Sequence, residues 1–219
     1  MKKPRLLDLF CGAGGASNGY WTAGFNVVGV DIKRQPQYPY EFVQADAMSY
    51  PLDGFDTIHA SPPCQRFSVA TRNLGSWERY DDLLTPIRER LTVSGLPWVI
   101  ENVPGAPLIA PIMLCGSMFG LWLLGRTKYL RRHRLFESNV KLWVPGECDH
   151  RGAALTVIGA GGKGGPNRKG RGEMATAETA RQLMGIPWIS GRQLGESIPP
   201  AYTAHIGRIL QAHLRGLTW

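Results

Sequence analysis

The clearest candidate for chemistry in the sequence is a cysteine that directly follows two prolines. Cys64 stands in residues 61–68 (SPPCQRFS), after the apolar run 55–60. A proline pair cannot continue a β-sheet ladder, so the thiol is expected on a rigid turn at the end of a strand. Free cysteines are more often buried and inert, and taken alone the pattern favours that interpretation. Presented on a turn, Cys64 would serve as a nucleophile.

A carboxyl group is the second candidate. Glu101 follows the apolar run 97–100 and precedes Asn102 and Val103. At the end of a buried strand, a desolvated carboxyl has a raised pKa and can donate a proton near neutral pH. Most glutamates lie at the surface, so a helix-capping or salt-bridging Glu101 is the more common alternative.

A glycine-rich turn, residues 11–15 (CGAGG), stands between an expected strand at 6–10 and an expected helix at 16–23. Such a turn directs backbone N–H groups at a ligand, and Asp31, which ends the next strand, stands where an acid can bond a ribose. Asp46 follows a third strand and could bond an adenine amino group. The pattern predicts a nucleoside-bearing cofactor, although it lacks full G-x-G-x-x-G spacing, and an ordinary turn with surface acids is the alternative.

The elements that would position these residues form an α/β fold. A strand, tight turn, helix and second strand (25–31) in close succession are typical of a parallel sheet with helices on its faces. The other expected elements are strands at 42–44, 57–60 and 98–100, helices at 80–93 (bent at Pro86), 177–184 and 202–214, and a turn at 195–200. Residues 159–172 are half glycine and otherwise mostly basic, which predicts a mobile loop with no element of its own.

Composition limits the partners and the setting. The 219 residues carry a net charge of +8, concentrated in 126–134 and 163–171, which favours nucleic acid as a partner; a merely solvated basic surface is the alternative. Four separated cysteines, no signal-peptide core and no long apolar run predict a soluble, cytoplasmic protein. Cys148 and His150 could bind a metal, but no second pair accompanies them, so no metal site is expected.

Five short segments of the chain, in their order along the sequence, indicate a family resemblance. They are residues 8–15 (DLFCGAGG), Pro63-Cys64-Gln65 with Phe67-Ser68, Glu101-Asn102-Val103, Arg132-x-Arg134, and residues 195–200 (GESIPP) before a closing helix. In content and order they resemble the motifs of the cytosine-5 DNA methyltransferase family. The resemblance implies a Rossmann-like S-adenosylmethionine-dependent methyltransferase fold, with a mostly parallel sheet, helices on both faces and a small irregular C-terminal subdomain.

The resemblance also implies methyl transfer from S-adenosylmethionine to carbon 5 of cytosine in DNA. Cys64 would attack carbon 6, and Glu101 would bond ring nitrogen 3 and the exocyclic amine. Arg132 and Arg134 would hold the base, which must leave the duplex stack, and the phosphates. The cofactor would contact Phe10, Gly12, Gly14, Asp31, Ile32, Asp46, Ala47, Pro63 and Ser197. DNA would contact Gln65, Ser68, Asn102, Lys163, Arg168, Lys169 and Arg171.

Two features depart from the family pattern. Glu196 stands where the family usually has Asn, which places a carboxylate beside Ser197. Only about forty residues separate Arg134 from the helix expected at 177, so a target-recognition domain is almost absent. We expect a cofactor-binding and catalytic domain at 1–137, a reduced target-recognition region at 138–176 and a segment returning to the catalytic domain at 177–219.

Several alternatives stay open at this point. A degenerate methyltransferase could bind DNA as a regulatory module without turnover, and an active one could act on RNA or on a free cytosine nucleotide. A partner subunit could supply the missing target recognition. The compact size would suit a restriction-modification enzyme of a phage or other mobile element.

Overall fold

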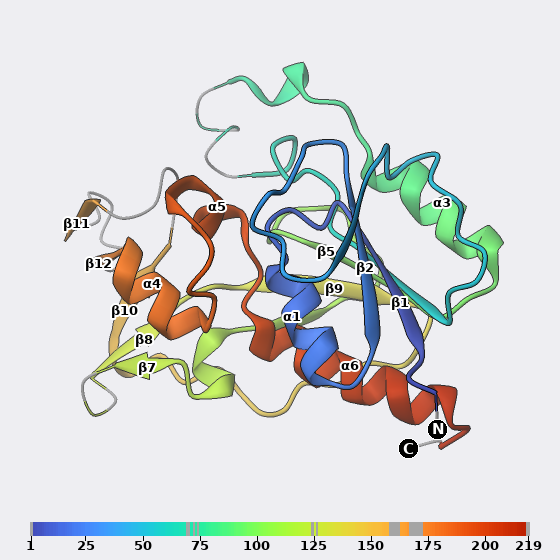
Figure 1. The fold of residues 1–219 in the computed structure, drawn as a ribbon. Helices are drawn as coiled ribbons and strands as arrows, with labels where there is room; N and C mark the ends of the chain where they lie inside the picture. The colour runs from blue at the N-terminus through green and yellow to red at the C-terminus, as the bar shows by residue number, and fades with distance from the viewer. Residues whose placement is uncertain are drawn as a thin grey trace.

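A seven-stranded sheet forms the centre of the part of the chain that the structure describes (Figure 1). The structure is a computed structural model, and it describes residues 2–217 except 69–70, 72, 74, 124, 126, 158–162 and 167–172. The strands are β1 (Arg5–Leu9), β2 (Asn26–Asp31), β3 (Glu41–Gln44), β4 (Thr57–Ala60), β5 (Trp98–Asn102), β6 (Ile112–Leu114) and β9 (Arg134–Ser138). Their order is β3-β2-β1-β4-β5-β9-β6; β1 to β5 are parallel, and β9 is antiparallel to both of its neighbours.

Helices cover both faces of this sheet (Figure 1). Because side chains alternate along a strand, Leu7 packs in the core under α3 (Leu84–Ser94), whereas Leu6 packs under α1 (Gly15–Thr22) and α6 (Pro200–Leu214). Parallel strands under two helical layers are buried on both faces. The carboxyl ends of the strands then remain as the edge where open α/β sheets bind ligands.

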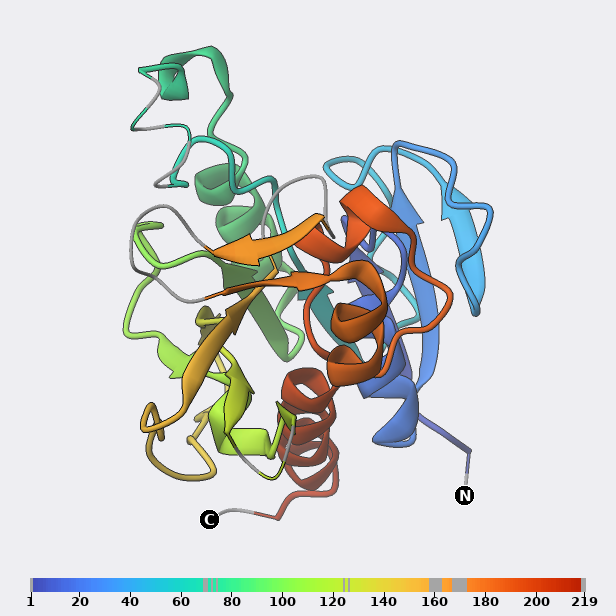
Figure 2. The same ribbon diagram turned by 90° about the vertical axis from the view of Figure 1, so that its left-hand side faces the viewer.

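A second, smaller sheet lies beside the first (Figure 2). Its strands are β7 (Trp122–Leu123), β8 (Lys128–Leu130), β10 (Ala153–Thr156), β11 (Lys163–Pro166) and β12 (Glu173–Thr176), in the order β11-β12-β10-β8-β7. The helices α4 (Ala177–Met184) and α5 (Gly191–Glu196) and the 3₁₀ helix η2 (Gly116–Phe119) accompany this sheet, whereas the 3₁₀ helix η1 (Trp77–Arg79) lies between β4 and α3. Leu130 and Leu155 of this sheet share an apolar core with Ala13, and Trp188 Nε1 donates to the Ala13 carbonyl at 2.9 Å. The small sheet therefore packs on the glycine turn.

The expected α/β fold with a mostly parallel sheet and helices on both faces is confirmed, and most expected elements are observed within two residues of their predicted bounds. The helix expected at 80–93 begins only at Leu84, whose backbone N–H has no partner within the helix and donates instead to the Asp82 carboxylate at 2.9 Å. Pro86 therefore lies in the first turn, where a proline removes no hydrogen bond and needs no bend.

Three further expectations differ from the structure. Residues 163–166 pair antiparallel with β12, so the expectation of no element in 159–172 is wrong for these four residues. Helix α5 includes Gly195 and Glu196, where a turn was expected. Strands β7 and β8 precede residue 138 yet belong to the second sheet, so the two sheets do not divide at the expected boundary. Among the described residues, no helix is long and apolar enough to cross a membrane.

The close packing of α1 on α6 generates a prediction about stability. A Cβ on Gly19 would lie 2.0 Å from Thr203 Oγ1 and 2.2 Å from the Pro200 carbonyl oxygen. We expect Gly19→Ala to lower the free energy of unfolding by about 1–3 kcal/mol because the helices must separate, although alanine favours a helix more than glycine does. Urea denaturation measures the change. Gly146→Ala is the control, since a Cβ there meets nothing within 4 Å; equal stability of both variants would contradict the prediction.

Candidate active site

The cysteine lies on a turn at the carboxyl end of β4, as the proline pair predicted. The backbone N–H groups of Phe67 and Ser68 donate to the Cys64 carbonyl at 3.0 and 2.9 Å. Phe67 is buried in the core under α3, and Arg66 donates to the Tyr80 carbonyl at 2.7 Å. These two anchors, which both follow Cys64 in the chain, therefore fix the turn that carries the half-buried thiol.

Asn102 connects β5 to this loop. Its Nδ2 donates to the Pro62 carbonyl at 3.1 Å, and its Oδ1 accepts the N–H of Val103. The side chain is fully buried and offers no surface to nucleic acid, contrary to the DNA contact expected from the sequence. Asn102 positions the loop that carries the thiol.

Glu101 and Arg134 form a buried ion pair across β5 and β9. Arg134 Nε lies 2.9 Å from Glu101 Oε1, and the two side chains are 14% and 8% exposed. Burial raises the pKa of Glu101, against the opposing effects of Arg134, Arg132 and a hydrogen bond from Ser61. The carboxyl at the strand end is thus desolvated, as the apolar run before it predicted, and it is held in one orientation by a cation.

A buried chain of hydrogen bonds reaches Glu101 from behind, and sequence analysis missed it. Tyr20 Oη lies 2.8 Å from His59 Nδ1, His59 Nε2 lies 2.7 Å from Ser61 Oγ, and Ser61 bonds Glu101. Burial lowers the pKa of His59 to about 3, so the imidazole is neutral near pH 7. A histidine inside the apolar strand 57–60 was the available signal, because a buried polar group needs partners.

The thiol is affected by the same charges. Burial raises the pKa of Cys64, Arg134 and Arg132 lower it, and Glu101 raises it. The arginines therefore act in the direction expected from the sequence, but burial outweighs them. Cys64, Glu101 and Arg134 consequently form one electrostatically coupled cluster at the edge of the sheet.

Arg132 is placed differently from its neighbour. Its guanidinium is buried and donates to the carbonyls of Val157 and Gly195 at 3.0 and 2.9 Å, and burial lowers its pKa to about 9. Tyr202 Oη donates to the backbone carbonyl of Arg132 at 2.6 Å. These contacts join β10, α5 and α6, which fits a positioning role better than the expected contact with base and phosphates.

The expected cofactor residues gather at the carboxyl ends of β1, β2 and β3. Asp31 accepts the backbone N–H groups of Gly12 and Lys33 at 3.0 and 2.9 Å, and so joins the glycine turn to β2. Phe10 has a φ of 58°, a left-handed conformation that is strained for a phenylalanine and common at ligand sites. A Cβ on Gly12 would meet nothing within 4 Å, so the space beside the turn is open.

The remaining cofactor candidates surround this turn. Ile32 is 66% exposed beside Asp31, which leaves an apolar face free, and the exposed Asp46 accepts the N–H of Met48 at 2.9 Å, next to the buried Ala47. Pro63 is exposed on the cysteine loop. Gly14, with a φ of 87°, caps α1, and a Cβ on Gly15 would lie 3.2 Å from that of Ser197. The last motif therefore reaches the turn, as expected.

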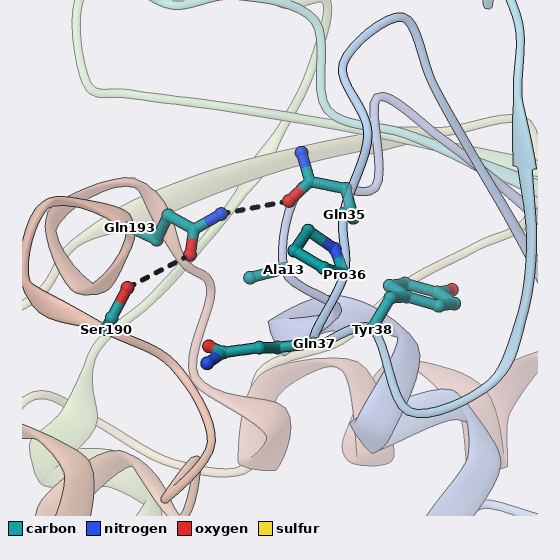
Figure 3. Close-up of a pocket in the computed structure, with 7 residues that line it drawn as sticks. All are labelled: Ala13, Gln35, Pro36, Gln37, Tyr38, Ser190 and Gln193. Atoms are coloured by element: carbon teal, nitrogen blue, oxygen red, sulfur yellow. Dashed lines mark hydrogen bonds between the residues drawn. The ribbon is translucent and has the colours of Figure 1, made fainter.

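A cavity of about 220 Å³ adjoins the turn (Figure 3). It is lined by Ala13, Gln35, Pro36, Gln37, Tyr38, Ser190 and Gln193. Gln193 Nε2 donates to Gln35 Oε1 at 2.9 Å, which bridges α5 to the segment after β2. None of the expected cofactor residues lines the cavity, but Ala13 lies in the glycine turn between two of them, Gly12 and Gly14. Polar side chains from α5 therefore extend the candidate site beyond what the motifs predicted.

Tyr38 fixes one wall of this cavity. Its hydroxyl lies 2.7 Å from Ser17 Oγ, and Ser17 donates to the buried Asp8 carboxyl. Burial raises the pKa of Asp8 to about 7. A Cβ on Gly14 would lie 3.0 Å from the Tyr38 ring, so glycine is needed there for the ring to pack on the turn.

The expected nucleic-acid residues are only partly described. Gln65 and Ser68 lie on the cysteine loop, and the buried Gln65 Oε1 has no hydrogen-bond partner among the described residues. Lys163 is described only as part of the backbone of β11. Arg168, Lys169 and Arg171 lie outside the described residues.

A family model matches the part of the chain that carries most of this site. Residues 4–106 match the family described as C-5 cytosine-specific DNA methylase. Over these residues the chain is similar to that family. The match includes the glycine turn, Cys64 and Glu101, and it ends before Arg132 and Arg134. No curated protein matches the chain in sequence.

Solved methyltransferases share the fold of the chain. A putative DNA modification methyltransferase encoded within an E. coli prophage is 18% identical, with 97% of this chain and 100% of that one covered and a TM-score of 0.58. The methyltransferase EhMeth of Entamoeba histolytica is 14% identical (98% and 99% covered, TM-score 0.61), and the Dnmt2 methyltransferase of S. pombe is 15% identical (97% and 99%, TM-score 0.62). At these identities the likeness shows the fold alone.

The coupling of Arg134 to Cys64 generates a prediction about thiol reactivity. Removing the guanidinium in Arg134→Ala should raise the pKa of Cys64 further, because its lowering effect is larger than the raising effect of Glu101. At pH 7–8 the rate of Cys64 alkylation by iodoacetamide should therefore fall by about tenfold for each unit of pKa gained. Peptide mass spectrometry locates the label. Arg134→Lys keeps the positive charge, so its rate of Cys64 alkylation should fall much less. Equal alkylation rates in the two variants would contradict the effect of Arg134 on the pKa of Cys64.

Proposed function

We propose that the protein is a DNA cytosine-5 methyltransferase that uses S-adenosylmethionine and acts through a covalent bond between Cys64 and the base. The observation that carries the proposal is the cluster of Cys64, Glu101 and Arg134. A nucleophile, a desolvated acid and a cation meet at the carboxyl edge of the sheet, beside the glycine turn. A protein that only bound DNA would need neither the thiol nor the raised carboxyl pKa.

The roles follow from the chemistry of each group. The Cys64 thiolate attacks carbon 6, the S–C bond forms, and the electrons of the 5,6 double bond move toward nitrogen 3, where Glu101 donates a proton. Carbon 5 then becomes nucleophilic and takes a methyl group. Loss of the proton on carbon 5 re-forms the 5,6 double bond, breaks the S–C bond and releases the thiolate, and nitrogen 3 returns its proton to the Glu101 carboxylate. Arg134 orients Glu101 and favours the thiolate, since opposite charge stabilises an anion.

The residues around the turn fit a nucleoside cofactor. Asp31 would bond the ribose, the exposed face of Ile32 would pack on the adenine, and Asp46 would accept from its amino group. The open space at Gly12 supports this fit. When bound there, S-adenosylmethionine would supply the electrophilic methyl group.

DNA is the substrate that we propose on the family match and the charge. A net charge of +8 favours a polyanion, and the basic residues 163–171 would contact phosphates of any sequence. The unpartnered Gln65 Oε1 on the cysteine loop would be satisfied by a donor from a flipped base or its neighbours. With so little sequence between β9 and α4, we propose a short target context, or recognition by a partner subunit.

Competition between substrates tests the proposal. Methyl-labelled cofactor is incubated with duplex DNA, tRNA and dCMP together, and each product is digested to nucleosides. Label in 5-methyldeoxycytidine from the duplex is the expected result. Label found mainly in tRNA or in dCMP would show that this molecule, and not DNA, is the substrate. DNA binding without label in any product would indicate a degenerate binding module.

The nucleophile is tested by replacing its sulfur. Cys64→Ser should bind S-adenosylmethionine normally in calorimetry but lose methyl transfer, because a serine hydroxyl is far less ionised than a thiol. Duplex DNA with 5-fluorocytosine gives a second measurement: fluorine cannot leave carbon 5 as a proton does, so the wild-type protein should stay bonded to it. Turnover of Cys64→Ser within tenfold of the wild type, or trapping of this variant, would disprove the covalent role.

The acid is tested by an isosteric amide. Glu101→Gln cannot donate a proton, so the single-turnover rate should fall by about 10²–10⁴-fold while affinity for DNA changes little. The loss of charge beside Arg134 should also lower the melting temperature, so rates are compared below it. Glu178→Gln, at an exposed position of α4, is the matched control. Weak DNA binding with a normal rate of chemistry would instead show a structural role for Glu101.

A further inference from the structure

Four potential metal ligands from three separate segments converge outside the active site. Cys115 follows β6, His133 stands between β8 and β9, and Cys148 and His150 lie in the segment between β9 and β10. One ligand atom from each lies within 4.8 Å of every other. Sequence analysis found only Cys148 and His150, because the second Cys and His come from distant parts of the chain.

Three of the distances between these atoms match the edges of a tetrahedron around one zinc ion. With Zn–S near 2.3 Å and Zn–N near 2.0–2.1 Å, tetrahedral edges are about 3.3 Å between two nitrogens and about 3.6 Å between sulfur and nitrogen. Nε2 of His133 lies 3.3 Å from Nε2 of His150. Cys115 Sγ lies 3.5 Å from His150 Nε2, and Cys148 Sγ lies 3.8 Å from His133 Nε2.

Hydrogen bonding alone explains this arrangement less well. A chain of hydrogen bonds requires contact only between successive groups, whereas here each of the four ligand atoms lies within 4.8 Å of the other three. Two thiols and two imidazoles without a carboxylate are also the donor set that favours zinc over magnesium or calcium. Four protein ligands close the coordination sphere, which is typical of structural rather than catalytic zinc.

Neighbouring side chains orient the ligands. Ser117 Oγ donates to Cys115 Sγ at 3.4 Å and accepts the backbone N–H of Asp149 at 3.2 Å, so it connects two of the ligand-bearing segments. The Tyr129 ring stacks on the His150 imidazole, with centroids 5.3 Å apart and planes at 9°. Such outer contacts fix ligand geometry in metal sites.

We propose that Cys115, His133, Cys148 and His150 bind one structural Zn²⁺ ion. The ion fixes residues 139–152, which form neither helix nor strand, to the end of β6 and the start of β9. It also fixes His133, whose neighbours in sequence are Arg132 and Arg134. Zinc thereby determines where β9 presents Arg134 to Glu101, and this assignment does not depend on the proposed substrate.

The metal content of the purified protein tests the site. The chain is expressed in zinc-supplemented medium, purified without added metal or chelator, and measured by plasma mass spectrometry; one zinc ion per chain is expected. Replacing zinc by Co²⁺ should give the intense ligand-field absorption of a tetrahedral Cys₂His₂ site together with sulfur-to-cobalt charge-transfer bands. Chelation of zinc should lower the melting temperature, and zinc should restore it.

Matched variants separate the site from adventitious binding. His150→Ala and Cys148→Ser, both at least partly exposed, should lose zinc and the cobalt spectrum, whereas His213→Ala and Cys11→Ser, outside the cluster, should retain both. A wild-type protein without zinc and without a tetrahedral cobalt spectrum would overturn the proposal, as would unchanged metal content in His150→Ala. If a ligand variant fails to fold, the zinc content and cobalt spectrum of the wild-type protein still test the proposed site.

Discussion

The ion pair between Glu101 and Arg134 is the interaction on which the candidate site depends. Both side chains are largely removed from water, and removing one partner of such a pair costs about 3–5 kcal/mol because the other charge remains buried and unpaired. The pair joins the last parallel strand, β5, to its antiparallel neighbour β9. The pair therefore connects a strand inside the family match to a strand outside it, since that match ends before β9 begins. The acid cannot keep its orientation unless the later part of the chain has folded onto the earlier part.

Burial acts on this site in two opposite ways. It raises the pKa of Glu101, which favours a proton donor, and it also raises the pKa of Cys64, which disfavours the thiolate. The neutral His59 and Ser61 add hydrogen bonds behind the acid without adding charge. A single buried environment thus raises the pKa of Glu101 directly, whereas the pKa of Cys64 is lowered mainly by Arg134, the arginine that also pairs with Glu101. Substrate binding would add its own charges to this balance.

Residues that act through local order were predictable from the sequence. The turn after β1, the proline pair before Cys64 and the carboxylate after a buried strand each follow from neighbours in the chain, and the structure places them as expected. Contacts made between distant segments were not predictable. The buried bond from Asn102 to Pro62, the backbone contacts of Arg132 and the assembly of the small sheet from five strands arise only when the chain closes on itself. The cluster around Cys115 escaped notice for the same reason, since no spacing rule connects its four members.

The position of α6 has a consequence for synthesis of the protein. This helix covers the sheet face that Leu6 and Val27 occupy, together with α1, yet its residues 200–214 leave the ribosome long after β1 and β2. Until α6 has been synthesised, the part of this apolar face that α6 will cover is exposed to water. Unpaired apolar surface of this kind associates with chaperones or with other nascent chains. This sheet face is therefore completed only after residue 214 is synthesised, and a ribosome that stalls before residue 200 would release a chain able to form the glycine turn but unable to cover the sheet face on which α6 packs.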